Sequence, residues 1–267
     1  MIVFLHVPKT AGTTFQWILQ NNFGIAHCQA VHIRKPVFNR DDFAFARKIF
    51  PWMQSISGGN FSNPLELGIP DPFFITFLRE PVARVLSHYQ MMLRRGYSLS
   101  FEETLRSDPL LENLHVKMMA GERNLDRAKA FLEQCNFVGL TEKFDLSLHA
   151  LERLCPQKLH LKYRRRQVAT DNAIRDRLQN DARIVELTRG YNQLDLELYS
   201  FAVSEIFPKF CAQAGLNPAD KVTSFEVTTN PVRAAQYMSR FYNQGVFRQV
   251  GKLRACARRL RGHSSAI

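Results

Sequence analysis

The strongest constraint on the fold comes from the N-terminal stretch at residues 4–14, which reads FLHVPKTAGTT. The residues before Pro8 are mostly apolar and rich in Val, Ile and Phe, a composition typical of a buried parallel strand. Pro8 ends that strand because its nitrogen carries no hydrogen to donate to a neighbouring strand. Gly12 permits a close approach of the backbone, and Thr13 and Thr14 can cap a following helix. The stretch therefore predicts a strand over residues 1–7, a tight loop and a helix.

This arrangement is suited to binding a phosphate group. A loop between a strand and a helix points backbone amides and a helix N-terminus at an anion, Lys9 adds a positive charge, and threonine hydroxyls add donors. It is not a Walker loop, in which lysine follows the second glycine, because Lys9 precedes Gly12. An ordinary threonine-rich turn with one exposed lysine would show the same residues. A second motif therefore has to decide between the two interpretations.

The composition is that of an ordinary globular protein. The chain has 267 residues, 45% hydrophobic and 22% charged, enough for one large α/β domain with a short appendage. No apolar stretch approaches the ~20 residues that span a bilayer, and the N-terminus lacks the pattern of a signal peptide. The five cysteines are scattered without a Cys-x-x-Cys pair, which argues against a zinc site or a disulfide framework. We therefore expect a cytoplasmic protein with reduced thiols.

Basic residues concentrate near the C-terminus. The formal net charge is +12, so anionic partners are expected, although no nucleic-acid-binding motif accompanies the charge. No acidic residue follows Glu226, whereas eight basic residues do. Within residues 245–262 apolar residues recur at helical spacing: Val246, Phe247, Val250, Leu253, Ala257 and Leu260. This segment predicts a basic amphipathic helix that either makes peripheral contact with a membrane or packs on the domain with a solvated basic face.

A second strand–turn–helix motif lies at residues 73–92. The apolar run FFITFL at residues 73–78 predicts a buried strand, which ends in Arg79, and Pro81 suits the first turn of the next helix. Arg79 at the carboxyl edge of a sheet and Ser87, about two turns into that helix, can converge on one anionic group. Further along, residues 136–139 predict a short strand, and residues 144–154 predict a helix.

The two motifs together resemble those of sulfotransferases that use 3′-phosphoadenosine-5′-phosphosulfate (PAPS). Residues 8–14 resemble the 5′-phosphosulfate loop of that family, and residues 76–89 resemble its 3′-phosphate-binding segment. Three weaker stretches, at residues 113–121, 136–142 and 192–199, look like blocks of the carbohydrate-type enzymes. That type includes the heparan sulfate 2-O- and 6-O-sulfotransferases and bacterial relatives, and this chain looks like a soluble, bacterial-style member.

The resemblance covers roughly residues 1–210 and implies a three-layer, P-loop-like α/β fold. A central parallel sheet with helices on both faces is expected. We assign residues 1–215 to a PAPS-dependent sulfotransferase domain and residues 216–267 to a basic C-terminal extension.

The resemblance also implies a reaction: in-line transfer of a sulfuryl group from PAPS onto a hydroxyl of a carbohydrate or glycoconjugate, without a metal. Lys9 would stabilise the leaving phosphate, and Arg79 with Ser87 would hold the 3′ phosphate. The residues expected to hold the 5′ phosphate are Lys9, Thr10, Ala11, Gly12, Thr13 and Thr14.

The chain departs from this family at the expected general base. Family members often carry Gly-His-aromatic between the two phosphate motifs, but this chain has Gly59-Asn60-Phe61. Asparagine cannot accept a proton at neutral pH, so Asn60 is assigned to acceptor binding. Glu66 and His32 are the two candidates for the base, and Glu66 needs partial burial to raise its pKa towards neutrality.

Two other classes of protein share features with this enzyme. A nucleotide kinase would also carry a phosphate loop after its first strand, but it needs the Walker spacing and an acid that holds magnesium. A catalytically impaired PAPS-binding protein is the stronger alternative, because Asn60 stands at the position of the family's base.

Overall fold

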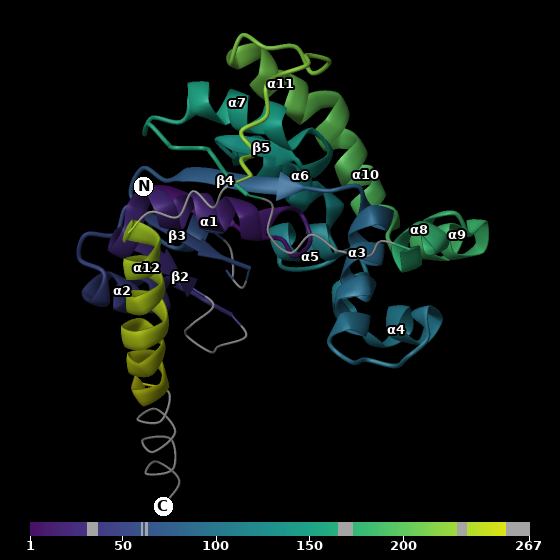
Figure 1. Cartoon of the computed structure of the whole chain (residues 1–267), viewed down its shortest axis with the longest axis horizontal. Coiled ribbons are helices and arrows are strands. Elements are labelled where there is room, and N and C mark those ends of the chain that lie inside the picture. The colour runs from purple at the N-terminus through teal and green to yellow at the C-terminus, as the bar shows by residue number, and fades with distance from the viewer. Residues whose placement is uncertain (31–36, 60, 62–63, 165–172, 229–233, 255–267) are drawn as a thin grey trace, which may run out of the picture.

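The structure is a computed structural model, and it describes residues 1–30, 37–59, 61, 64–164, 173–228 and 234–254 (Figure 1). The described residues form a five-stranded sheet in the order β2-β3-β1-β4-β5, with every neighbouring pair parallel. Its strands are β1 (Ile2–Leu5), β2 (His27–Gln29), β3 (Ser55–Gly58), β4 (Phe73–Leu78) and β5 (Phe137–Leu140). Helices lie on both faces of this sheet, so the domain has three layers (Figure 1). This arrangement confirms the predicted fold class.

The helices connect the strands and extend the domain beyond β5. They are α1 (Gly12–Phe23), α2 (Arg40–Ile49), α3 (Pro81–Arg94), α4 (Phe101–Ser107), α5 (Leu114–Ala120), α6 (Leu125–Gln134), α7 (Phe144–Leu154), α8 (Ala173–Gln179), α9 (Ala182–Tyr191), α10 (Gln193–Phe201), α11 (Phe207–Gln213) and α12 (Ala234–Arg240). A π-helical stretch, Phe241–Phe247, continues α12, and the helix then runs to residue 254.

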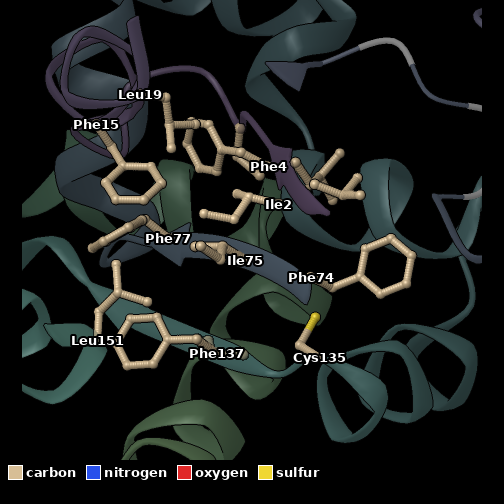
Figure 2. Packing of buried hydrophobic residues seen from close by; sticks show 14 of the residues in the cluster. Ile2, Phe4, Phe15, Leu19, Phe74, Ile75, Phe77, Cys135, Phe137 and Leu151 are labelled. Atoms are coloured by element: carbon tan, nitrogen blue, oxygen red, sulfur yellow. The ribbon is translucent and has the colours of Figure 1, made fainter. Parts of the chain in front are cut away.

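Aromatic side chains form the centre of the core. Phe4 on β1 packs edge-on against Phe15 of α1 at 4.8 Å and against Phe77 of β4 at 6.3 Å between ring centroids. Phe77 also contacts Phe144 of α7 at 5.2 Å. Figure 2 shows Phe4, Phe15 and Phe77 packed together between the sheet and α1. The contacts hold α1 and α7 against β1 and β4, the two strands that lead into the predicted site.

The sheet has a topological switch point between β1 and β4. From β1 the chain passes through α1 to the β2 edge, whereas from β4 it passes through α3 towards the β5 edge. The two connections leave on opposite sides, so a crevice opens outside the carboxyl ends of β1 and β4. Ligands bind in such a crevice in open α/β sheets.

The predicted strands are confirmed within one or two residues, but β2 and β3 were not predicted. Both are short and carry polar side chains at buried positions, so neither shows a continuous apolar run. Their polar groups pair across the sheet. The ring of His27 contacts Ser55 Oγ at 2.8 Å through Nδ1 and Ser57 Oγ at 3.1 Å through Nε2.

The C-terminal helix starts earlier than predicted, and over its described residues it packs on the domain. Phe247 is fully buried and its ring lies 5.0 Å from that of Phe50, so the apolar stripe predicted for a membrane is partly used in the core. Val246 and Val250 are half-buried. Among the described residues, no helix combines the length and apolarity needed to cross a membrane. The boundary at residue 215 stays a prediction.

Asn243 attaches this helix to the edge of the sheet. Its side-chain amide donates to the carbonyl of His27 at 2.7 Å, and its side-chain oxygen accepts from the N–H of Gln29 at 2.8 Å. The amide also donates to the carbonyl of Ser239 at 2.9 Å. The side chain thereby satisfies backbone groups on the outer side of β2, which would otherwise form an open sheet edge.

We expect Asn243→Ala to lower the free energy of unfolding by at least about 2 kcal/mol, because it leaves a buried donor and a buried acceptor of β2 without partners. Urea denaturation of both variants measures the effect. The exposed neighbour provides the matched control, and Gln244→Ala should change stability by less than about 0.5 kcal/mol. Equal stabilities for the two variants would contradict the edge-covering role.

Two fully buried histidines predict a pH-dependent stability. Burial lowers the pKa of His27 to about 3 and that of His115 to about 4, although Asp195 opposes the shift at His115. Between about pH 6.5 and those values the unfolded chain binds protons that the native protein does not bind, so stability falls as pH falls. Each histidine contributes a slope of up to about 1.4 kcal/mol per pH unit.

Urea denaturation between pH 7 and pH 5 tests this expectation. In His27→Gln the free energy of unfolding should depend less steeply on pH, by the uptake of one proton. The matched control is Gln244→Ala at an exposed position, which changes no titratable group and should leave the slope unchanged. An unchanged slope in His27→Gln would show that His27 is not the group responsible.

Candidate active site

The loop after β1 is a compact turn with two residues in the left-handed region. Lys9 has φ 72° and Ala11 has φ 62°. Between them Thr10 is fully buried, and its hydroxyl donates to the carbonyl of Val7 at 2.9 Å. Left-handed residues alternating with ordinary ones turn successive N–H groups towards one side, which makes a concavity suited to anions. Because α1 begins at Gly12, its free N–H groups face the same concavity.

The threonines after Gly12 do not cap α1, contrary to the prediction. The N-cap is Ala11, which has no side chain that could accept a capping bond, and Thr14 already lies inside the helix. The N–H of Thr14 donates to the carbonyl of Ala11 at 2.9 Å. The left-handed turn at Ala11 starts the helix before Thr13, so both threonines stand in its first turn. Their predicted contact with the 5′ phosphate is untested.

Gly12 is required by the packing of His6. A Cβ atom at Gly12 would lie 2.1 Å from Cδ2 and 2.5 Å from Nε2 of the His6 ring. Burial lowers the pKa of His6 to about 4, so the imidazole is neutral near neutral pH. The ring therefore fills space beneath the start of α1 and adds no charge to the loop.

Arg79 joins the loop after β4 to the loop after β1. It directly follows β4, and its Nη1 donates to the carbonyl of Lys9 at 3.2 Å. The next residue, Glu80, caps α3: its carboxylate accepts from the N–H of Val82 at 3.1 Å and from that of Ala83 at 2.6 Å. The structure thus brings together the two predicted anion-binding loops.

The electrostatics of this region are strongly positive around Lys9. Its pKa is lowered, first by burial and then by the positive charges of Arg79, Arg94 and Arg95. A half-buried ammonium group near three guanidinium groups is suited to a polyanionic ligand.

Helix α3 carries the third predicted element, Ser87, together with polar residues that the sequence did not single out. Ser87 is half-buried two turns into the helix. Arg84 is fully buried, and its Nη1 donates to the carbonyl of Leu110 at 2.9 Å. Its Nε and Nη2 have no hydrogen-bond partner among the described residues. Burial lowers the pKa of Arg84 to about 10, and nearby Arg79 adds to the shift against the opposing charge of Asp195.

His88 follows on the same helix as a buried imidazole paired with an acid. Its Nε2 lies 3.2 Å from Oδ2 of Asp108, and its Nδ1 has no partner among the described residues. Its pKa is lowered by burial, which outweighs the effect of Asp108. Arg84 and His88 are four residues apart, about one helical turn, so both lie on the same side of α3.

On the acceptor side the structure describes only part of what was predicted. His32 and Asn60 lie outside the described residues. A Cβ atom on the preceding residue, Gly59, would meet the carbonyl oxygen of His6 at 2.7 Å, so the segment leading to Asn60 runs against the end of β1. Glu66 lies in a 3₁₀ turn, Pro64–Glu66, and its side chain is exposed. The burial that would make Glu66 a base near neutral pH is therefore not seen.

Comparison with known proteins supports a sulfotransferase-like relationship. Over 103 residues the chain is 27% identical to the heparan sulfate 2-O-sulfotransferase hst-2 of Caenorhabditis elegans. The match covers 34% of this chain and 32% of the relative, so the chain spans about a third of the relative's length. No protein-family model matches the chain. The α/β fold agrees with this distant similarity.

A double substitution tests the packing of the loop. Gly12→Ala should destabilise the protein by about 1–3 kcal/mol, because the added methyl group overlaps the His6 ring. In a His6→Ala background the same change should be neutral or slightly stabilising, since alanine favours helix more than glycine does. Urea denaturation of the four proteins gives the coupling energy. Equal effects of Gly12→Ala in both backgrounds would show that the ring does not require the glycine.

Proposed function

We propose that this protein transfers the sulfuryl group of PAPS to a hydroxyl of a carbohydrate or glycoconjugate. The observation that supports the proposal is the hydrogen bond between Arg79 and the carbonyl of Lys9, which joins the two loops predicted to bind anions at a sheet switch point. A donor with separate 5′ and 3′ phosphate groups matches two such loops. The similarity to a heparan sulfate 2-O-sulfotransferase supports the same reaction class.

The two loops bind opposite ends of the donor. The left-handed loop and the start of α1 hold the 5′ phosphosulfate through backbone N–H groups. Arg79 and Ser87 hold the 3′ phosphate, which distinguishes PAPS from other adenine nucleotides. Positioning both ends lines up the sulfur for attack from outside the sheet.

In the transfer step the acceptor oxygen forms a bond to sulfur while the bond from sulfur to the bridging phosphate oxygen breaks. The electron pair of the broken bond leaves with the phosphate, giving adenosine 3′,5′-bisphosphate, and a base accepts the acceptor proton. Lys9 faces the charge that develops on the leaving phosphate, because it lies in the loop between β1 and α1 at the mouth of the crevice. Its surrounding arginines strengthen the field at that point.

A PAPS-binding protein without transferase activity is the second candidate. The observation that favours it is the asparagine at position 60, where the resembled family has its histidine base. This second candidate should bind the same nucleotide but transfer no sulfuryl group. Measuring sulfuryl transfer to a panel of hydroxyl acceptors therefore separates the two candidates.

Lys9→Ala should lower turnover by about a hundredfold to a thousandfold, because it removes the charge that stabilises the leaving group. Transfer of labelled sulfuryl from PAPS to a panel of glycans measures the rate. Lys221→Ala, at an exposed position distant in sequence from both loops, is the matched control and should keep wild-type activity. Loss of nucleotide binding equal to the loss of rate would assign Lys9 to ground-state binding alone.

The base is tested by single-turnover transfer in Glu66→Gln, His32→Ala and Asn60→His. We expect Glu66→Gln to remove most of the turnover while nucleotide binding persists, provided that substrate binding buries this exposed carboxylate. A near-normal rate in Glu66→Gln together with a large loss in His32→Ala would move the assignment to His32. A large gain in Asn60→His would indicate that the natural protein has lost its base, in favour of the second candidate.

A further inference from the structure

The C-terminal helix has one face in the core and an opposite face that exposes large apolar side chains. The buried face carries Gln236, Ser239, Asn243, Phe247 and Gly251. On the other face Tyr237 is 65% exposed, Phe241 73% and Leu253 70%, the three highest exposures of large hydrophobic side chains among the described residues. Met238 is 53% exposed beside them. We call these four residues the apolar tail face.

The π-helical stretch keeps this face in line along the helix. An α-helix has 3.6 residues per turn, so residues four apart are rotated slightly past one another around its axis. A π-helical stretch has more residues per turn, so it reverses part of that rotation. Tyr237 lies four residues before Phe241, and Leu253 lies twelve after it, with the π-helical residues between. The wider turns thus carry Leu253 back to the side of the helix on which Tyr237 and Phe241 stand.

A further exposed aromatic lies beside the helix. The ring of Trp52, which is 50% exposed, contacts that of Tyr242 at 6.5 Å between centroids. Tyr242 is itself attached to α2, because its hydroxyl donates to the carbonyl of Ile49 at 2.7 Å. The exposed apolar surface thus continues from the helix onto the loop after α2.

The charged residues on the helix that carries this face are all basic. Arg240 is exposed on the helix and Lys252 is half-buried near its end, and the last turn of α2 adds exposed Arg47 and Lys48, whereas its first turn exposes Asp41. Arg254 is engaged with the domain: it lies 3.4 Å from Asp42 and stacks on Phe45 at 4.0 Å. The sequence from residue 227 onward contains no acidic residue.

We propose that the apolar tail face docks on an anionic lipid bilayer, with Tyr237, Phe241 and Leu253 entering the interfacial region. Aromatic and aliphatic side chains flanked by arginine and lysine are the composition of helices that lie in a membrane interface. Each basic residue near an anionic surface adds attraction. A nucleic acid would match the charge, but Met238 and Leu253 offer it neither a stacking surface nor a hydrogen bond.

The position of the helix leaves the candidate active site accessible. A Cβ atom on Gly24, at the C-terminal end of α1, would meet Ala235 at 3.3 Å, whereas the donor loop lies at the other end of α1. The twelve residues of α1 separate the two by about 18 Å. Figure 1 shows α12 beside α2 and β2, away from α3 and the tip of β4.

Flotation of the full chain with vesicles tests this docking independently of any enzymatic activity. The protein should bind vesicles of phosphatidylcholine with phosphatidylserine at least about tenfold more strongly than vesicles of phosphatidylcholine alone, and high salt should weaken binding. Tyr237→Ser/Phe241→Ser should reduce the partition coefficient by about tenfold or more. Tyr97→Ser/Leu99→Ser, at exposed positions elsewhere, is the matched control and should bind like wild type.

Met238→Ser/Leu253→Ser provides a second pair of variants on the same face, and thermal unfolding checks that every variant folds. Equal partitioning of wild type and both tail-face variants would overturn the proposal. So would binding of a single-stranded oligonucleotide that is lost in Tyr237→Ser/Phe241→Ser while vesicle binding is unchanged.

Discussion

The hydrogen bond from Arg79 to the carbonyl of Lys9 is the contact on which the candidate site depends. It is available because β1 and β4 are adjacent parallel strands, with Leu5, the last residue of β1, opposite Thr76, two residues before the end of β4. The hydroxyl of Thr76 donates to the carbonyl of Leu5 at 3.1 Å, which strengthens this register at the end of β1. A shift of one residue would separate the two loops and turn Phe4 and Phe77 away from their shared core face.

The site concentrates unfavourable features that the rest of the domain has to offset. Lys9 and Ala11 adopt left-handed conformations, which cost roughly 1–2 kcal/mol for each residue that is not glycine. Arg84 buries a guanidinium with two of its nitrogens unpartnered among the described residues. The aromatic contact between Phe4 and Phe77 holds together β1 and β4, the strands that lead into the two loops. Such strain at one end of a well-packed sheet is common at binding sites, where a ligand supplies the missing interactions.

The sequence was sufficient to predict the strands that carry the two loops, because β1, β4 and β5 are continuous apolar runs buried on both faces. It was not sufficient for β2 and β3. Their buried polar residues are explained only by partners on the neighbouring strand, such as Ser55 for His27, and single-strand patterns do not show such partners.

The candidate site, like the sheet, was predictable only where local sequence determines it. The loops carrying Lys9 and Arg79 followed from local motifs, and the structure brings them together. The start of α1 at Gly12, the buried Arg84 and the contact of Asn243 with β2 were not predictable, since each depends on residues distant in sequence. The expected burial of Glu66 likewise depended on tertiary packing, and the side chain is exposed.

The most direct test of the central claim is a thermodynamic cycle of nucleotide binding by calorimetry. Adenosine 3′,5′-bisphosphate and adenosine 5′-phosphate are each titrated into the wild-type protein and into Arg79→Ala. If Arg79 holds the 3′ phosphate, losing that phosphate should weaken wild-type binding by about tenfold to a hundredfold, the effect of one charge-assisted contact. The same loss should be nearly absent in Arg79→Ala. An equal loss of affinity in both proteins would contradict the assignment of two loops to the two ends of one donor.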